Sequence, residues 1–505
     1  MRTKAATGVA VLAGLALAGC TSVRPDADFD VVREQVRERT GVQPQWNALR
    51  PEDAQVEERS RELLARELTV DAAVELALLN NRRLQAAYEE IGVARADLVQ
   101  AGLLVNPVLS ADLTFGVSGP GQGVAIGLVQ NFMRALQIPL RKRVAEAALE
   151  EAKFAVAAQV IDLVVEVRRA FVRAQGAEQL VELDQRIADA TRLSTEVAQQ
   201  QRTAGNITDL DLANEVALFE DARVRLAVNE AEATVAREDL TALMGLWGPL
   251  AAWTIMKRLP DPLDDLPVDG LESLAVSQRA DLAAARQATE ALNQALGLTG
   301  LYGVMSDAEF GPEVERDLDS GIWSVGPLLS IPIPIFDQGQ ATRASALARL
   351  RQSQERFTAL AVEIRSQVRR AHARLQAMHA LASHYRRVVL PLRSRIVDQT
   401  QLQYNAMQVG VFQLLQARQA QIDAARAYLE VVKDYWLARA DLEGAVGGAF
   451  PEAAPTAAAS ATTTPALAPR DTAAAGLVAP DSGAVTRRPS DIKAEPAAVH
   501  QGDHS

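Results

Sequence analysis

The sequence predicts a mainly α-helical chain with a small β component, in which one helix–strand–helix unit occurs twice. Three observations predict this fold class. Apolar residues recur at intervals of three and four over very long segments, short segments alternate between apolar and polar residues, and the same motifs return about 200 positions later. The repeated unit is expected to form long α-helical hairpins that build an α-barrel.

Two pairs of long helices are expected, one pair in each half. In the first long helix, residues such as Val160, Val164 and Phe171 form the apolar stripe. This helix contains no proline after Pro139. The helix expected at the same place in the second half contains Pro391. Shorter helices precede each pair, so each long helix can lie beside two short ones and form a wall. The expected ranges are 137–202, 209–244, 340–404 and 413–446 for the pairs, and 69–104 and 271–298 for the shorter helices.

The two halves match residue by residue. The segment 167–170 (Val-Arg-Arg-Ala) returns at 368–371, and Leu84 returns as Leu282. The helix that ends at Gly245 corresponds to the one that ends at Gly447. Chance similarity between Ala- and Arg-rich helices would not keep the spacing so constant, so the pattern indicates duplication of one large unit.

Strands are expected between the helices of each half. After Pro107, apolar Leu109 and Leu113 alternate with polar Ser110 and Asp112, which predicts strands within about 108–132. A weaker pattern within about 298–331 predicts strands at 298–310 and 322–331, separated by an acidic loop. Four strands cannot close a channel, because transmembrane barrels begin at about eight strands. A small membrane β-barrel therefore requires an oligomer, and three chains would supply about twelve strands.

The first twenty residues read as a targeting segment. A basic start and a short apolar run end in the sequence Leu-Ala-Gly-Cys, which resembles the lipobox of bacterial lipoproteins. This resemblance implies a signal peptide at 1–19 and lipidation, with palmitate, at Cys20. The alternative is an ordinary signal peptide that is followed by a chance cysteine. No later run is apolar and long enough to predict a transmembrane helix.

Composition excludes several functions. The net charge of -12 argues against a nucleic-acid partner, and a single cysteine rules out an intrachain disulfide. The sequence contains no phosphate loop, nucleophile elbow or paired-histidine zinc motif, so neither an enzyme nor a cofactor is expected. His372 and His379 share a helix face about 10 Å apart, which is too far for one metal ion. Residues 449–505, rich in Ala, Pro and Thr, are expected to be a disordered tail, with a structured extension as the alternative.

Several motifs resemble the TolC family of outer-membrane efflux channels, in its lipoprotein branch. These are 68–73 (Leu-Thr-Val-Asp-Ala-Ala), 77–81 (Ala-Leu-Leu-Asn-Asn), 100–107 (Gln-Ala-Gly-Leu-Leu-Val-Asn-Pro) and 331–337 (Ile-Pro-Ile-Pro-Ile-Phe-Asp). The resemblance covers about 60–450. It implies a homotrimer in the bacterial outer membrane that extends through the periplasm and provides a passive exit for heavy metals or drugs. It also implies an inner-membrane pump and a periplasmic adaptor protein as partners.

The resemblance also implies a gate and an adaptor-docking surface at the two hairpin tips. The residues assigned to it are Gly205, Asn206, Ile207, Thr208, Asp209, Val409, Gly410, Val411, Phe412, Gln416 and Gln419. The family's acidic ring falls on Gln416 and Gln419 here, which puts that ring in doubt. Asp209 and Asp211 could supply the charge instead, or could simply stabilise a helix N-terminus. Both tip glycines are expected to take a positive φ.

The predicted organisation has six parts, and two other classes of protein were weighed. The parts are a signal peptide (1–19), a lipidated segment (20–67), a first repeat (68–246), a connector (247–270), a second repeat (271–448) and a tail (449–505). A lipid-anchored coiled-coil scaffold without a pore would not need the strand segments. A periplasmic enzyme would need a polar constellation that the sequence lacks.

Overall fold

The structure is a computed structural model that describes residues 23–46, 54–115, 121–256, 258–263, 270–299 and 307–448. All of them belong to one compact unit, Met1–Pro451. The expected signal peptide, the lipidation site Cys20 and the expected tail lie outside the described residues.

The first repeat consists of helices and strands in the predicted order. They are α4 (Val70–Asn80), α5 (Arg82–Gly102), β1 (Val108–Thr114), β2 (Gly123–Asn131), the short α6 (Phe132–Leu136), α7 (Ile138–Thr203) and α8 (Asp209–Leu243). Two further helices precede it, α2 (Asp26–Thr40) and α3 (Ala54–Leu64). After the 3-10 turn η2 (Gly248–Ala251), the connector returns to the first repeat, because the Leu68 N–H donates to the Thr254 carbonyl at 2.7 Å.

The second repeat has the same order of elements. They are α9 (Leu271–Gln278), α10 (Ala280–Leu296) with the turn η3 (Gly297–Thr299), β3 (Glu309–Asp317), β4 (Trp323–Ser330), α12 (Gln340–His384), the π-helical turn η4 (Tyr385–Val389), α13 (Leu390–Asn405) and α14 (Val411–Val446). The duplication predicted from the sequence is thus present in the fold.

The short helices differ from the prediction, because each is broken at one residue. Asn81 separates α4 from α5, where its side chain accepts a hydrogen bond from the Leu84 N–H at 3.0 Å and donates one to the Leu243 carbonyl at 2.9 Å. Arg279 separates α9 from α10 at the corresponding place. An asparagine cap satisfies a free N–H at a helix start, so it favours a break where periodicity alone predicts continuity.

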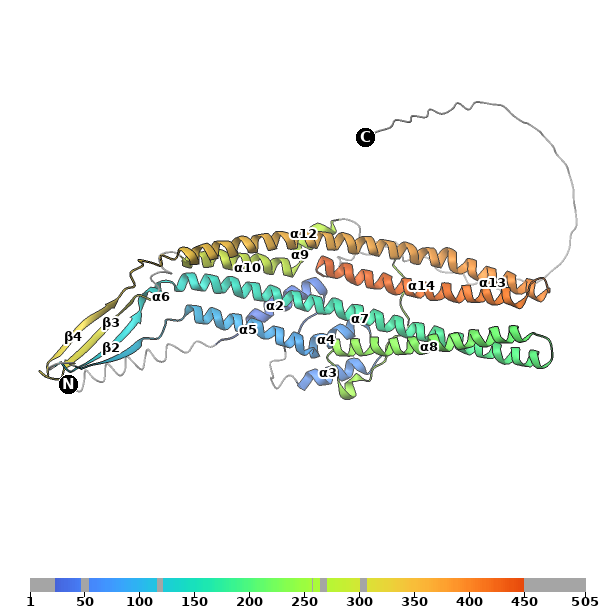
Figure 1. Cartoon of the computed structure of the whole chain (residues 1–505), viewed down its shortest axis with the longest axis horizontal. Coiled ribbons are helices and arrows are strands. Elements are labelled where there is room, and N and C mark those ends of the chain that lie inside the picture. Colours follow the sequence, from blue (N-terminus) through green and yellow to red (C-terminus); the bar gives the residue numbers. More distant parts are fainter. Residues whose placement is uncertain are drawn as a thin grey trace, which may run out of the picture. The chain divides into compact units, whose positions relative to one another are not determined.

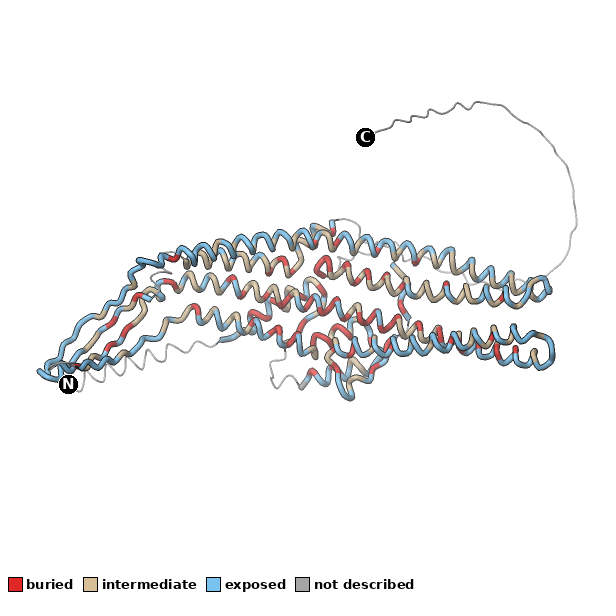
Figure 2. The backbone as a smooth tube through the Cα atoms, in the orientation of Figure 1, coloured by how far each residue is buried: buried red, intermediate tan, exposed pale blue. Residues whose placement is uncertain are grey.

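Both repeats pack on α7. In Figure 1 the helix α7 runs between α5 and α8 on one side and α10 and α14 on the other, with α12 at the far edge. The buried residues of α7 include Val156, Val160, Val164, Val167 and Phe171, at intervals of three and four. Figure 2 shows that buried positions gather in the middle of this helical layer, whereas both hairpin ends are exposed. No helix among the described residues is long and apolar enough to cross a membrane.

The sheet has two chemically different faces. Its four antiparallel strands lie in the order β1-β2-β3-β4, and the register sets mainly apolar rows beside rows of polar and small residues. One row is Ala111, Ile126, Val314 and Val325, and the next row is Asp112, Ala125, Glu315 and Ser324. The alternation predicted after Pro107 therefore extends across the whole sheet.

The third strand corrects the prediction for the second half. Most of the segment expected to be an acidic loop is β3, and the expected strand 298–310 overlaps it only at its end. Phe310 and Val314 alternate with Glu309, Glu313 and Glu315, so the acids occupy one face of a strand. Their charge obscured the period of two. The last strand, expected at 322–331, is close to its predicted place.

The two hairpin turns differ from each other. Gly205 has φ +78°, as expected, but Gly410 has φ -77° and ψ 164°, which is extended backbone. The expectation of a positive φ at Gly410 is wrong. Gly410 is the N-cap of α14 and matches Thr208, the N-cap of α8, while the left-handed position of the second tip is Met407, with φ 58°.

The tip geometry predicts opposite effects for two substitutions. Met407→Gly should stabilise the second tip by about 1 kcal/mol, because a non-glycine residue is strained at positive φ. Gly205→Ala should weaken the first tip by a similar amount. Hydrogen exchange of tip peptides in purified protein should then slow about five-fold in the former and quicken in the latter.

Gly410→Ala is the matched control. Its backbone is extended, and the nearest atom to an added Cβ is Gln413 Oε1 at 3.4 Å, so exchange should hardly change. Equal loss of protection in Gly205→Ala and Gly410→Ala would contradict the assignment.

Candidate functional site

The first tip is a short turn held by polar contacts. Beyond Gly205, Asn206 and Ile207 lead to Thr208, whose hydroxyl accepts a hydrogen bond from the Asp211 N–H at 3.1 Å. The Asp211 carboxylate accepts one from the Thr208 N–H at 3.0 Å, which completes a capping box.

Both acids of this tip are engaged locally. Asp209 accepts two hydrogen bonds from the Arg202 guanidinium, at 2.5 and 2.9 Å, and this arginine lowers the pKa of its carboxyl. The hydrogen bonds from Thr208 lower the pKa of Asp211. The sequence left open whether these acids form a charged ring or start a helix, and these contacts favour the helix start.

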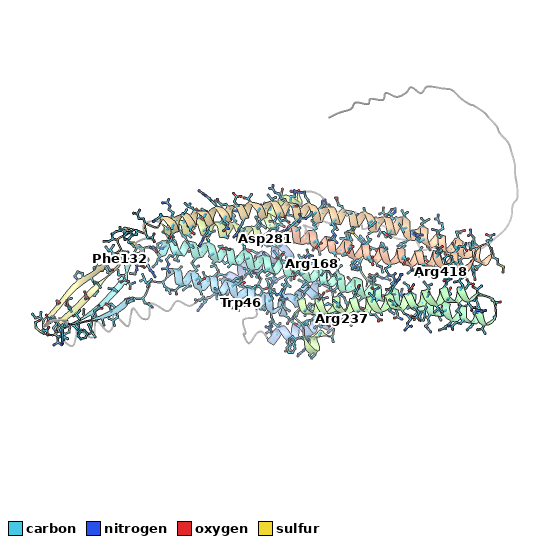
Figure 3. All side chains as sticks on the ribbon, viewed as in Figure 1. Trp46, Phe132, Arg168, Arg237, Asp281 and Arg418 are labelled. Atoms are coloured by element: carbon cyan, nitrogen blue, oxygen red, sulfur yellow. The ribbon has the colours of Figure 1, made fainter. Side chains whose placement is uncertain are left out.

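The second tip presents apolar side chains. Met407 is 93% exposed, Phe412 is exposed, and Val409 and Val411 are half-buried. The Gly410 N–H donates to the Gln413 side chain at 2.7 Å. Arg418, labelled near this end in Figure 3, donates to Gln401 on α13 at 2.9 Å and so joins the two arms of the hairpin.

The two glutamines assigned to the gate have different surroundings. Gln416 is exposed on α14. Gln419 lines a cavity of about 300 Å³ between the hairpins and donates to Asp423 at 3.0 Å. Asp423 also lies 3.5 Å from Arg225 of α8 and 3.7 Å from Arg426.

A buried ion pair that sequence analysis missed joins the two hairpins. Asp184 of α7 is 1% exposed and accepts bonds from Arg426 of α14, which is 17% exposed, and from Asn229 of α8. One carboxylate thus holds three helices together. Opposite charges on helices that were expected to be neighbours could have suggested this pair, but the sequence did not show which helix faces are in contact.

A second set of ion pairs crosses between the repeats at mid-length, near Arg168 in Figure 3. Arg168 is bonded to Glu443, and Arg169 lies 2.6 Å from Asp441. Arg374 of α12 reaches the same aspartate at 3.8 Å. The repeated Val-Arg-Arg-Ala motif marked this region as duplicated, and the structure shows that its first copy holds the two repeats together.

Nothing among the described residues forms a metal centre. No group of three or more His, Cys, Asp or Glu side chains there is placed to hold an ion. His379 packs beside Tyr435, with ring centroids 6.1 Å apart, and its Nε2 is buried without a hydrogen-bond partner.

The buried pair predicts an asymmetric response to mutation. Arg426→Met should destabilise the hairpin contact by roughly 3–5 kcal/mol, because it leaves the buried Asp184 carboxylate without its cation. Adding Asp184→Asn should recover most of the loss. Urea unfolding of the hairpin region, followed by hydrogen exchange, measures both effects.

Arg225→Met is the control, since Arg225 pairs with Asp423 at an exposed site and should contribute less than about 1 kcal/mol. If it costs as much as Arg426→Met, the buried pair is not what joins the hairpins.

Comparisons with known proteins agree with this architecture. The sequence model of a family described as outer membrane efflux protein matches residues 73–246. The cobalt-zinc-cadmium resistance protein CzcC of Cupriavidus metallidurans is 26% identical over 396 residues, which cover 75% of this chain and 90% of that protein. The outer membrane protein OprJ of Pseudomonas aeruginosa is 28% identical over 308 residues, covering 55% and 62%.

Solved structures share the fold. A crystal structure of CusC, described in connection with transmembrane channel formation, aligns with a TM-score of 0.64 at 19% identity and covers 75% of this chain and 92% of that one. The family match spans the first repeat, and the alignment to CzcC covers most of that protein's length. The first repeat therefore matches the family of outer membrane efflux proteins, and similarity to CzcC extends over three quarters of the chain.

Proposed function

We propose that three copies of this outer-membrane efflux protein form a passive exit duct for divalent metal ions. In this proposal an inner-membrane pump supplies the driving force, and a periplasmic adaptor docks on the hairpin tips. The observation that carries the proposal is the two-faced sheet with two open edges. A scaffold without a pore would need neither feature.

The chemistry of the sheet fits a wall between lipid and water. Leu109, Leu113, Ile126, Trp323 and Val325 are exposed large apolar side chains of one face. In water, hydration of this apolar surface would be unfavourable, whereas in a membrane lipid would cover it. The opposite face is polar and suits an aqueous lumen.

The open edges fit closure by further copies. In the order β1-β2-β3-β4, the edge strands β1 and β4 each have one partner. The strands alternate in direction, so β4 of one copy can pair antiparallel with β1 of the next. Three copies of a four-stranded sheet would supply twelve strands, which is above the minimum of about eight.

Two further features concern partners and anchoring. Leu210, Met407 and Phe412 expose apolar side chains at the tips, which suits a docking surface for an adaptor. Lipid at Cys20 would add a second membrane attachment, and mass spectrometry of the mature N-terminus tests it.

The metal substrate rests on similarity and charge. CzcC is by name a cobalt, zinc and cadmium resistance protein, and Glu309, Glu313 and Glu315 lie on the polar face of the sheet together with Asp112. Acidic side chains that line a pore favour cations. Drug efflux, which the resemblance to the TolC family also implies, is the second candidate.

Deletion of the gene and complementation test the function. The deletion should raise sensitivity to cobalt, zinc and cadmium salts, and the wild-type gene should restore growth. Crosslinking of the purified protein in detergent should stop at three chains. Sensitivity to drugs alone would favour the second candidate, and a stable monomer with complete strand content would contradict the duct.

The gate assignment predicts a change in selectivity. Gln416→Glu would place three acids near the tunnel entrance of the trimer, so the pore should prefer cations more strongly at low salt, where charges are screened least. Single-channel reversal potentials in a salt gradient compare the variant with wild type. An unchanged reversal potential would show that position 416 does not face the lumen.

A further inference from the structure

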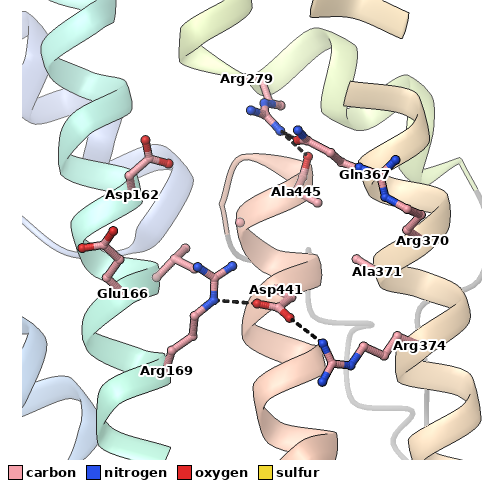
Figure 4. A pocket seen from close by; sticks show the side chains of 12 residues that line it. Asp162, Glu166, Arg169, Arg279, Gln367, Arg370, Ala371, Arg374, Asp441 and Ala445 are labelled. Carbon is pink, nitrogen blue, oxygen red and sulfur yellow. Dashed lines mark hydrogen bonds and ion pairs between the residues drawn. The ribbon is translucent and has the colours of Figure 1, made fainter. Parts of the chain in front are cut away.

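A cavity of about 590 Å³ lies where the two repeats meet (Figure 4). Helix α7 of the first repeat forms one wall, with Asp162, Glu166 and Arg169. The second repeat supplies the rest from α12, α14 and the break between α9 and α10.

Two contacts hold α7 against the second repeat beside this cavity. Arg169 of α7 lies 2.6 Å from Asp441 of α14, which Arg374 of α12 approaches from its own repeat at 3.8 Å. About one turn further along α14, the two helices come very close, because a Cβ added at Gly444 would lie 3.1 Å from Val165 Cγ1 and 3.7 Å from Val165 Cβ.

The first repeat has a cavity of about 660 Å³ at the corresponding place. The duplication maps its lining onto the second-repeat part of the first cavity. Arg173 corresponds to Arg374, Asp239 to Asp441 and Ala242 to Gly444. Likewise Asn81 corresponds to Arg279, and Arg169 to Arg370.

This second cavity lacks the wall that α7 gives to the first. The residues equivalent to that wall are on α12, where Glu363 matches Asp162, Ser366 matches Val165 and Arg370 matches Arg169. One chain cannot bring them together, because α12 and α8 lie at opposite edges of the helical layer (Figure 1). Among the described residues, Asp239 has no ion-pair partner in its own chain.

We propose that α12 of a neighbouring copy of this chain closes the second cavity. Arg370 of the neighbour forms an ion pair with Asp239 as Arg169 does with Asp441, and its Ser366 lies against Ala242 as Val165 lies against Gly444. The inference rests on the proposed trimer and names the residues that would hold it together.

Exposure and charge on the two free faces support a second copy as the occupant. Within the chain, Arg370 bonds to Glu363 at 2.7 Å, but both side chains are exposed and can reorient. Val235 of α8 is 62% exposed, whereas its equivalent Leu437 is partly buried against the apolar cluster of Val172, Leu259 and Val432. A face that is buried in one copy of the repeat is therefore open in the other.

Paired cysteines test the contact. Cβ atoms about 3.5–4.5 Å apart can form a disulfide, and the equivalent pair in the chain is 3.7 Å apart. Ala242→Cys with Ser366→Cys should therefore link neighbouring chains in the full-length protein, and non-reducing gels should show a ladder that ends at three chains. Val165→Cys with Gly444→Cys is the matched control, whose disulfide should stay within one chain. Both pairs are built with Cys20→Ser to remove the native thiol.

The outcomes separate this inference from the proposed function. If wild-type protein is trimeric but the 242/366 pair does not link chains while the control pair forms, the inference is overturned and the duct stands. A ladder that ends at two chains would indicate a face-to-face contact and would also overturn it. If no trimer exists in wild type, the proposed function fails as well.

A charge exchange gives an independent measurement. Asp239→Arg and Arg370→Asp should each lower the fraction of trimer that survives detergent and heat, and the double variant should recover most of it. Asp239→Arg combined with Arg369→Asp is the control, because Arg369 corresponds to Arg168, and the partner of Arg168, Glu443, is matched by the uncharged Thr241. Recovery in the control, or none in the exchange, would refute the pairing.

Discussion

The packing of both repeats on one helix is the constraint on which the rest of the structure depends. Helix α7 buries an aliphatic stripe that contacts α5 and α8 of its own repeat and α10 and α14 of the other. Each fully buried valine of that stripe contributes on the order of 1.5–3 kcal/mol. Two ion pairs with α14 lie beside this stripe, one at Arg168 and one at Asp184. They set which face of α14 can contact α7, because a wrong register would leave buried charges unpaired.

The second helical hairpin is one residue longer than the first, and a single π-helical turn accounts for the extra residue. Val167 corresponds to Val368, a shift of 201 positions, whereas Gly245 corresponds to Gly447, a shift of 202. Between them lies the π-helical turn η4, directly before Pro391. A π turn accommodates one extra residue, and it also removes the clash between the proline ring and the preceding turn. The second hairpin therefore gains a residue while its apolar stripe still points toward the helices on which it packs.

Periodicity predicted the long helices and the repeat correctly, because these features depend on many residues that agree. The features that were missed depend on single residues. Asn81 breaks a helix through its side-chain cap, Met407 takes the left-handed position that Gly410 was expected to fill, and the acids of β3 hid a strand. The tips were located by motif, but their contacts were not, since Arg202 with Asp209 and Asp184 with Arg426 depend on how helices rotate against each other.

Both the sheet and the helical layer leave surfaces without a partner inside one chain. The open edges of the sheet are β1, from the first repeat, and β4, from the second. The open faces of the helical layer are on α8 of the first repeat and α12 of the second. In both layers, a first-repeat surface of one copy would have to meet a second-repeat surface of the next, which is a head-to-tail contact. Such contacts form a ring when the rotation closes and a filament when it does not. The contact between the two repeats inside one chain already sets the rotation at half of the contacts around such a ring. The proposed trimer therefore needs only one further kind of interface, the one between neighbouring copies.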